Sequence, residues 1–155
     1  MSNGFVFTLQ WAILLVSVLA PVTAGAPVHV WETVEITLHA TDRYESPWTD
    51  VEVWVDLEGP GFSDRCYGFW DGGDTFRVRV QATAPSTWRW RSGAEPADAG
   101  LSGSSGAFEA KPWTDAEKRA NPNRRGQIRP AQGGRYFAYA DGTPCLLLAD
   151  TLWAG

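Results

Sequence analysis

Apolar and polar residues alternate along several short segments of the chain. Residues 51–57 have Val or Leu at every odd position, and residues 52–58 have a charged residue or Trp54 at every even position. Residues 75–81 and 87–91 follow the same alternation. A period of two places neighbouring side chains on opposite faces of a β-strand. These segments are therefore predicted to be strands with one buried face.

Turn-forming residues separate the predicted strands, at residues 58–61, 71–74 and 84–86. The segment before residue 71 and the strand from Thr75 are predicted to form a hairpin. Short strands with turns between them are typical of a β-sandwich of about 100 residues. We therefore predict a mainly β fold, with an immunoglobulin-like antiparallel β-sandwich at residues 26–111. The Gly- and Ser-rich residues 99–106 are expected to be a flexible connection within it.

The pattern changes after Pro112. Thr114 and Glu117 have the spacing of a capping box, and Asn121-Pro122 ends the short helix that this box begins. We assign residues 112–134 to a linker that contains this helix. A second hairpin is expected from residues 135–139 and 144–149, and its apolar second half is typical of a strand buried on both faces.

The first 24 residues have the composition of a signal peptide. An apolar stretch from Trp11 to Ala20 precedes Pro21 and the small residues Val22 and Ala24, which fit cleavage after Ala24. Residues 2–10 contain no Lys or Arg, so an uncleaved anchor is the competing hypothesis, although its apolar run barely reaches the roughly 20 residues that a membrane span needs. We predict a secreted or periplasmic protein with no stable membrane span after cleavage.

Charge and residue spacing argue against several functions. The net charge of −5 and the lack of a Lys/Arg block make nucleic acid an unexpected partner. No His/Cys cluster has metal-ligand spacing, so we predict neither a metal nor a cofactor. Asp64, Asp71 and Asp74 match no known calcium loop. His29 and His39 are interpreted as surface residues, and Cys66 and Cys145 as free thiols rather than a disulfide pair.

Nine Trp residues are an unusual number for 155 residues. Four of them lie in the predicted strands, and two interpretations stay open: a sugar-binding platform, or packing in the core and between domains, which sandwiches use heavily. Packing is favoured. Trp54 is the best surface candidate because it lies on the polar side of its strand; the others are Trp70, Trp88 and Trp90.

Residues 30–155 resemble the amino-terminal part of secreted bacterial apiosidase-like glycoside hydrolases. The matching stretches are Trp31–Ile36, Gly68–Gly73, Phe76–Arg79, Trp88–Trp90 with Gly103–Phe108, and above all Tyr136–Pro144 leading to Leu148–Trp153. The resemblance implies an immunoglobulin-like domain of unknown function followed by a (β/α)₈ barrel. Residues 135–155 would then be the truncated start of that barrel. Ala149, Leu152 and Cys145 depart from the residues that are common in the family at these positions.

The resemblance also implies a position for Asp150 at the carboxyl end of the first barrel strand, where barrel enzymes place their sites. Asp150 and Trp153 are the predicted substrate-binding residues. The alternatives are that Asp150 caps the next helix together with Thr151 and that Trp153 packs beneath the site. Glycoside hydrolysis needs two carboxylates across one bond. Because the family's catalytic pair lies on later strands, we predict no catalytic residue in this chain.

Three functions follow as hypotheses. The favoured one is an accessory module at the amino terminus of a secreted glycoside hydrolase, which meets its polysaccharide or oligosaccharide substrate through the missing barrel. The alternatives are a carbohydrate-binding module and a non-catalytic exported interaction protein. The chain itself is not expected to be catalytic.

Overall fold

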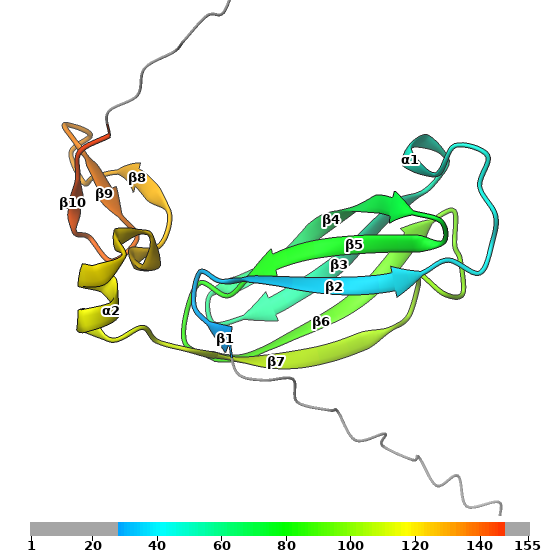
Figure 1. Cartoon of the computed structure of the whole chain (residues 1–155), viewed down its shortest axis with the longest axis horizontal. Coiled ribbons are helices and arrows are strands. Elements are labelled where there is room, and N and C mark those ends of the chain that lie inside the picture. The colour runs from blue at the N-terminus through cyan, green and yellow to red at the C-terminus, as the bar shows by residue number, and fades with distance from the viewer. Residues whose placement is uncertain (1–27, 148–155) are drawn as a thin grey trace, which may run out of the picture.

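The computed structural model describes residues 28–147, so the predicted signal peptide at residues 1–24 lies outside the described residues. Seven strands form one sheet in the order β1-β7-β6-β3-β4-β5-β2. Their bounds are β1 Val28–His29, β2 Thr33–His39, β3 Glu52–Gly59, β4 Phe62–Gly72, β5 Thr75–Gln81, β6 Ser86–Glu95 and β7 Ser105–Lys111. The expectation of a mainly β chain is confirmed (Figure 1).

The sheet is continuous and nearly closed on itself, which gives it a barrel-like form. The first half of β4, up to Tyr67, pairs with β3, and its second half, from Gly68, pairs with β5. The two sides of the fold are therefore joined by hydrogen bonds along one long strand, where two separate layers were predicted. The parallel pairing of β1 with β7 also departs from the purely antiparallel prediction.

Residues 30 and 31 bring the two edges of the sheet together. Val30 donates its N–H to the carbonyl of Lys111 at the end of β7, and Trp31 donates its N–H to the carbonyl of Ala82 just after β5. The chain then enters β2, which pairs with β5 along its full length. Closure leaves little unpaired edge, and such edges otherwise favour aggregation.

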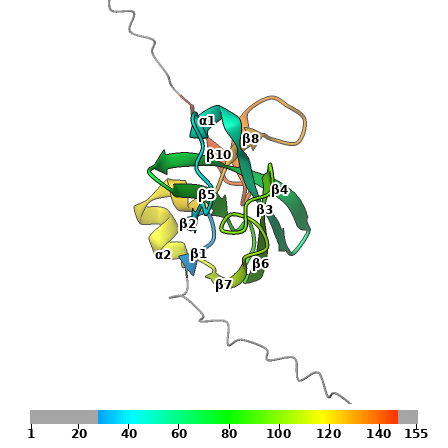
Figure 2. The same cartoon turned by 90° about the vertical axis from the view of Figure 1, so that its right-hand side faces the viewer.

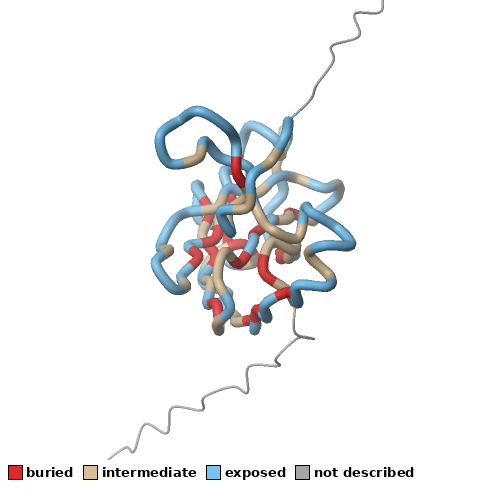
Figure 3. Tube along the Cα trace, turned by 90° about the vertical axis from the view of Figure 1, so that its left-hand side faces the viewer, coloured by how far each residue is buried: buried red, intermediate tan, exposed pale blue. Residues whose placement is uncertain are grey.

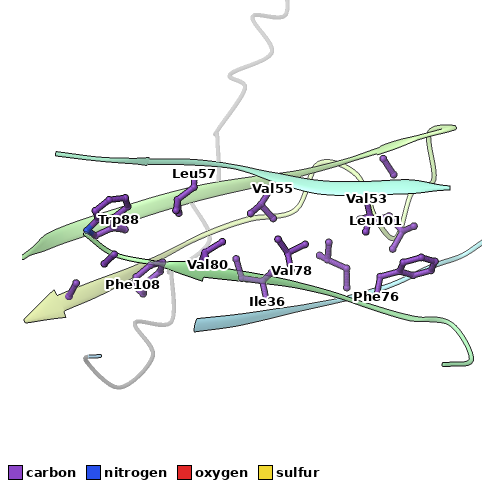
Figure 4. Close-up of a cluster of buried hydrophobic side chains, with 14 of the residues drawn as sticks. Ile36, Val53, Val55, Leu57, Phe76, Val78, Val80, Trp88, Leu101 and Phe108 are labelled. Atoms are coloured by element: carbon purple, nitrogen blue, oxygen red, sulfur yellow. The ribbon is translucent and has the colours of Figure 1, made fainter. Parts of the chain in front are cut away.

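The predicted inward positions form the core. Val53, Val55 and Leu57 of β3 face Phe76, Val78 and Val80 of β5, and all six are at most 2% exposed (Figure 4). Ile36 and Leu38 of β2 are also buried, whereas Thr37 between them is exposed. The period-two pattern therefore assigned the inner and outer faces correctly, and the predicted hairpin of β4 and β5 is confirmed.

The Gly- and Ser-rich segment at residues 99–106 is an ordered part of the fold, so the prediction of a flexible connection is wrong. Leu101 is completely buried in the core, and Asp98 is only 2% exposed. The Asp98 carboxylate accepts hydrogen bonds from the backbone N–H groups of Thr41, Asp42, Gly100 and Leu101. One buried carboxylate thus joins this loop to the loop that follows β2.

Two short helices lie outside the sheet. Helix α1 (Pro47–Asp50) precedes β3, and helix α2 (Asp115–Ala120) follows β7. The capping box at the start of α2 is confirmed, because Thr114 accepts the N–H of Glu117 and the Glu117 carboxylate accepts the N–H of Thr114. Among the described residues, no helix has the length and apolar character needed to cross a bilayer.

A small three-stranded sheet follows α2 and the 3₁₀ helix η1 (Pro122–Arg125). Its strands are β8 Ile128–Pro130, β9 Phe137–Tyr139 and β10 Pro144–Cys145. The predicted hairpin of β9 and β10 is confirmed, but β10 has only two residues and is not buried on both faces as predicted. Strand β8 lies in the region predicted to be linker. This end of the molecule is largely exposed (Figure 3), and Leu146 and Leu147 are 82% and 54% exposed.

Candidate functional site

The predicted substrate-binding residues Asp150 and Trp153 lie outside the described residues, so their roles stay predictions. The strand tryptophans, in contrast, lie within the described residues, and their burial tests whether they pack in the core. Trp88 is completely buried, and Trp90 and Trp70 are half-buried against the core. Packing explains Trp88 and Trp90 better than a sugar-binding platform does, whereas Trp70 packs on the core and also lines the groove described below.

Trp54 is half-buried on the outer face of β3, and its ring is covered by neighbouring groups. The Arg65 guanidinium lies 4.1 Å from the ring centroid, and Asp56 holds that guanidinium through a 2.8 Å hydrogen bond. A Cβ at Gly93 would lie 2.6 Å from the Trp54 ring, so only glycine fits beneath it. Because these groups occupy the ring, Trp54 does not offer a free face to a ligand.

The structure reveals an aromatic groove that the sequence analysis missed. It opens where β4 leaves β3, and α1 covers one end of it. Its volume is about 420 Å³, in the range of ligand pockets. Its lining includes the partly or largely exposed aromatic residues Trp48, Tyr67, Phe69 and Trp70, the buried Phe76, and the polar residues Thr49 and Glu52. We call this feature the aromatic groove.

Trp48 and Trp70 form the centre of the aromatic groove. Their ring centroids are 5.5 Å apart, and the planes are tilted by 47°. The Trp70 indole N–H donates a 3.0 Å hydrogen bond to the carbonyl of Gly73, which fixes that ring. Trp48 is 66% exposed, so most of its indole remains in contact with water. The Ser46-Pro47 dipeptide before Trp48 signals a helix start, but nothing in the local sequence predicts that Trp48 meets Trp70.

A second feature is the junction between the seven-stranded sheet and the segment after β7. Trp113, only 9% exposed, donates its indole N–H to the carbonyl of Val30 over 2.9 Å. The His29 ring stacks on Trp113 with centroids 3.8 Å apart, and the Arg124 guanidinium lies 4.1 Å from the Trp113 ring. His29 was interpreted as a plain surface residue, but it packs within this junction.

Trp31 completes the junction from the other side. Its φ of 68° is in the left-handed region, which residues other than glycine rarely adopt and which costs about 1–3 kcal/mol. The Trp31 ring lies against Gly126, where an added Cβ would come within 2.4 Å of it. Strain of this kind persists only where surrounding contacts hold the residue in place. The region predicted to be a linker is therefore fastened to the sheet.

The small sheet is tied to η1 by a partly exposed ion pair. Arg125 donates to the carboxylate of Asp141 and to the hydroxyl of Thr143, each over 2.8 Å. Burial raises the pKa of Asp141, but hydrogen bonds from Thr143 and Arg125 outweigh this effect and leave the pKa below its usual value. Asp141 therefore has a structural role in the turn between β9 and β10.

The remaining candidate side chains are engaged in local contacts. Asp71 pairs with Arg77, which also pairs with Glu35, and Asp74 lies 3.5 Å from His39. Within residues 28–147, no group of three acidic, His or Cys side chains is arranged to hold a metal ion. Cys66 and Cys145 are free thiols, but both are only partly buried, and burial raises the pKa of Cys66.

A family model and a solved structure each match part of the chain. The family model described as a domain of unknown function (DUF5060) matches residues 27–95, which is less than half of the chain. A crystal structure of a putative glycoside hydrolase from Bacteroides vulgatus is similar in fold, with a TM-score of 0.62 and 20% sequence identity. The match covers 77% of this chain and 21% of that one, so the chain spans about a fifth of the solved structure. No curated protein matches the chain.

We expect the junction to depend on Trp113. Replacing Trp113 with Ala removes the hydrogen bond to Val30 and the stacking of His29 and Arg124, so residues 114–126 lose their anchor. Trypsin should then cleave after Lys118, Arg119, Arg124 or Arg125 at least about tenfold faster, because proteolysis follows local opening. Mass spectrometry of timed digests measures this rate. The control is Trp48→Ala, which should leave it unchanged; equal rates in the two variants would contradict the assigned anchor.

Proposed function

We propose that this chain is the amino-terminal accessory part of a secreted glycoside hydrolase, with an immunoglobulin-like module that precedes a (β/α)₈ barrel. The observation that carries the proposal is the shared fold with the Bacteroides vulgatus protein, which extends over 77% of this chain. The coverage of only 21% of that protein is what an accessory module joined to a large catalytic domain would give. The apiosidase-like motifs at residues 136–144 and 148–153 support the same family.

The junction supports a structural role for the module. A flexible tether would leave module and barrel free to move, which is the default for domains with small interfaces. Here Trp113 and Trp31 fasten the connecting segment to the sheet. We infer that the module holds a fixed orientation relative to whatever follows residue 147, and that it acts as a rigid spacer.

The exposed apolar residues after β10 fit a strand that is completed by further packing. Leu146 and Leu147 follow β10 directly and are among the most exposed large apolar residues in the described region. A first barrel strand at this position would bury them between its neighbours and the surrounding helices. In this arrangement Asp150 and Trp153 would reach the substrate end of the barrel, and the substrate would be a polysaccharide or oligosaccharide.

Catalysis by the 155-residue chain is not expected, because its carboxylates after residue 112 are engaged elsewhere. Asp115 and Glu117 belong to the first turn of α2, where Glu117 closes the capping box, and Asp141 is paired with Arg125. Only Asp150 remains for a site, and hydrolysis of a glycosidic bond needs a second carboxylate at about 5–9.5 Å. Export through residues 1–24 is part of the same proposal.

The test compares two proteins on a panel of pectic and other plant glycans. We expect no sugar release by the 155-residue chain and sugar release by the same gene continued through a full barrel. The Asp150→Ala variant of the longer protein should bind ligand more weakly. Sugar release by the short chain would contradict the assignment of catalysis to a later region. A folded longer protein that releases nothing, or a stop codon directly after Gly155, would favour the non-catalytic interaction protein instead.

A further inference from the structure

The structure points to a second saccharide site, which we propose to be the aromatic groove between β3 and β4. Its ligand would be a neutral saccharide chain stacked on Trp48 and Trp70. This inference stands on the geometry of residues 47–76 and does not depend on a catalytic barrel. It also differs from a site at Trp54, whose ring is covered by Arg65.

The exposure of Trp48 needs an explanation beyond folding. Helix α1 has no buried residue, so Trp48 adds little to the core. The helix is nevertheless held by local hydrogen bonds: Asp50 accepts the N–H of Ser46 over 2.7 Å, and the Thr49 hydroxyl donates to the carbonyl of Ser46. A large aromatic side chain that is left in water beside other aromatic residues is typical of a binding surface.

The aromatic groove is preformed on both sides. On the β4 side, the hydrogen bond from Trp70 to Gly73 fixes the ring orientation. Gly68 lies where β4 changes partners, and a Cβ there would come within 2.8 Å of Val53 and Val78. The split between β3 and β4 is therefore set by the backbone, and a ligand would meet a surface that needs little reorganisation, which favours affinity.

The lining chemistry selects the class of ligand. Indole and phenol rings suit the apolar faces of sugar rings, while the Thr49 hydroxyl, the Tyr67 phenol and the Glu52 carboxylate are partners for sugar hydroxyls. Glu52 is the only charged residue among those that line the aromatic groove. An acidic sugar or a nucleic acid would place a negative charge beside Glu52, and the guanidinium over the lining residue Phe69 belongs to Arg79, which is already paired with Glu35. A neutral saccharide avoids this repulsion.

The position of the aromatic groove leaves it open to an external ligand. Helix α1 and the small sheet of β8, β9 and β10 lie at opposite ends of the molecule (Figure 1). Figure 2 faces the α1 end, with the small sheet behind it. Strand β4, which runs toward the α1 end, has 11 residues, or about 36 Å at the usual rise per residue. A domain that continues from β10 would begin at the far end, so we expect it to leave the aromatic groove uncovered.

The test is isothermal titration of the 155-residue chain with three neutral probes, cellohexaose, xylohexaose and mannohexaose, and with hexagalacturonate as the acidic comparison. We expect saturable binding of at least one neutral probe and at least about tenfold weaker binding of hexagalacturonate. Trp48→Ala should weaken binding of the neutral probe at least about tenfold, the loss typical of truncating a central aromatic contact. Because Trp48 is 66% exposed, this variant should fold like the parent chain.

The matched control is Trp54→Ala, which removes the same side chain outside the aromatic groove and should change affinity less than about twofold. The inference is overturned if none of the neutral probes binds, if hexagalacturonate binds as tightly as they do, or if Trp54→Ala weakens binding as much as Trp48→Ala. Glu52→Gln gives a second test. It should reduce the difference in affinity between the neutral probes and hexagalacturonate, because it removes the negative charge of Glu52. An unchanged difference would contradict the assigned role of Glu52.

Discussion

Replacement of Trp88 by Ala is expected to lower the free energy of unfolding by about 4 kcal/mol, the cost usual for removing a fully buried Trp. Trp88 is the largest completely buried side chain. Its ring packs on Gly59 and beside Phe62, and its indole N–H donates a 2.9 Å hydrogen bond to the carbonyl of Ala84. The substitution therefore leaves a cavity and an unsatisfied carbonyl. Urea unfolding followed by circular dichroism measures the change.

Trp48→Ala is the matched control for this prediction, because it deletes the same side chain at an exposed position. Its expected cost is within about 0.5 kcal/mol, as for most surface substitutions. The two variants together separate a Trp that stabilises the fold from one that is available to a ligand. A loss of stability in Trp48→Ala comparable to that in Trp88→Ala would show that α1 is part of the core, and would remove the main argument for the aromatic groove.

Asp98→Asn is expected to destabilise the protein by about 2–4 kcal/mol at neutral pH, in line with the loss of a buried, charge-assisted hydrogen-bond network. Asp98 accepts hydrogen bonds from backbone N–H groups on both loops and from the hydroxyls of Thr41 and Tyr44. An Asn side chain has one oxygen and would turn an N–H group toward these donors. The control is Asp42→Asn in the loop that follows β2, whose exposed side chain should tolerate the change.

The contribution of Asp98 to the stability of the fold depends on pH in a defined direction. Burial by itself raises the pKa of Asp98, but hydrogen bonds from Thr41, Asp42 and Gly100 outweigh burial and hold the pKa well below its usual range. Burial, together with the hydrogen bond that the Tyr44 hydroxyl donates to Asp98, raises the pKa of Tyr44 to about 12. Because the folded pKa of Asp98 is depressed, its stabilisation is fully present above the unfolded value near 3.9 and is lost as the pH falls below it.

Urea unfolding of the parent chain and of Asp98→Asn at several pH values checks this sign. The difference in stability should be constant from about pH 5 to 8 and should shrink as the pH falls below about 4. A difference that grows in acid would contradict a depressed pKa. A constant difference down to pH 2 would show that the donors, rather than the ionised state of Asp98, account for the effect.

The core could be predicted from the sequence because strand periodicity is local information. Each Val or Phe at alternate positions of β3 and β5 faces inward as expected, since one buried face fixes the register of a strand. The capping box at Thr114 and the hairpin turn at Asp141-Gly142 were predictable for the same reason: each depends on residues three or four positions apart. The resemblance to glycoside hydrolases likewise rested on contiguous motifs.

The packing that the sequence did not predict depends on contacts between residues far apart in the chain. Residues 99–106 have the composition of a linker, yet Leu101 fills the core and Asp98 binds a loop more than 50 residues earlier. The region around Gly126 also has linker composition, but it packs against Trp31. Composition describes the average behaviour of a segment and carries no information about a distant partner.

By itself, the sequence determined the main strands of the core, which face of each is buried, where the helix after β7 begins and which family the chain resembles. Only the tertiary structure decided that β4 joins both sides of the fold in one nearly closed sheet, that Trp31 and Trp113 fasten the connecting segment, and that Trp48 meets Trp70 across the aromatic groove. Periodicity and caps are fixed by neighbours within a few residues. Strand pairing and aromatic contacts depend on how separated segments pack, which single-residue preferences do not specify.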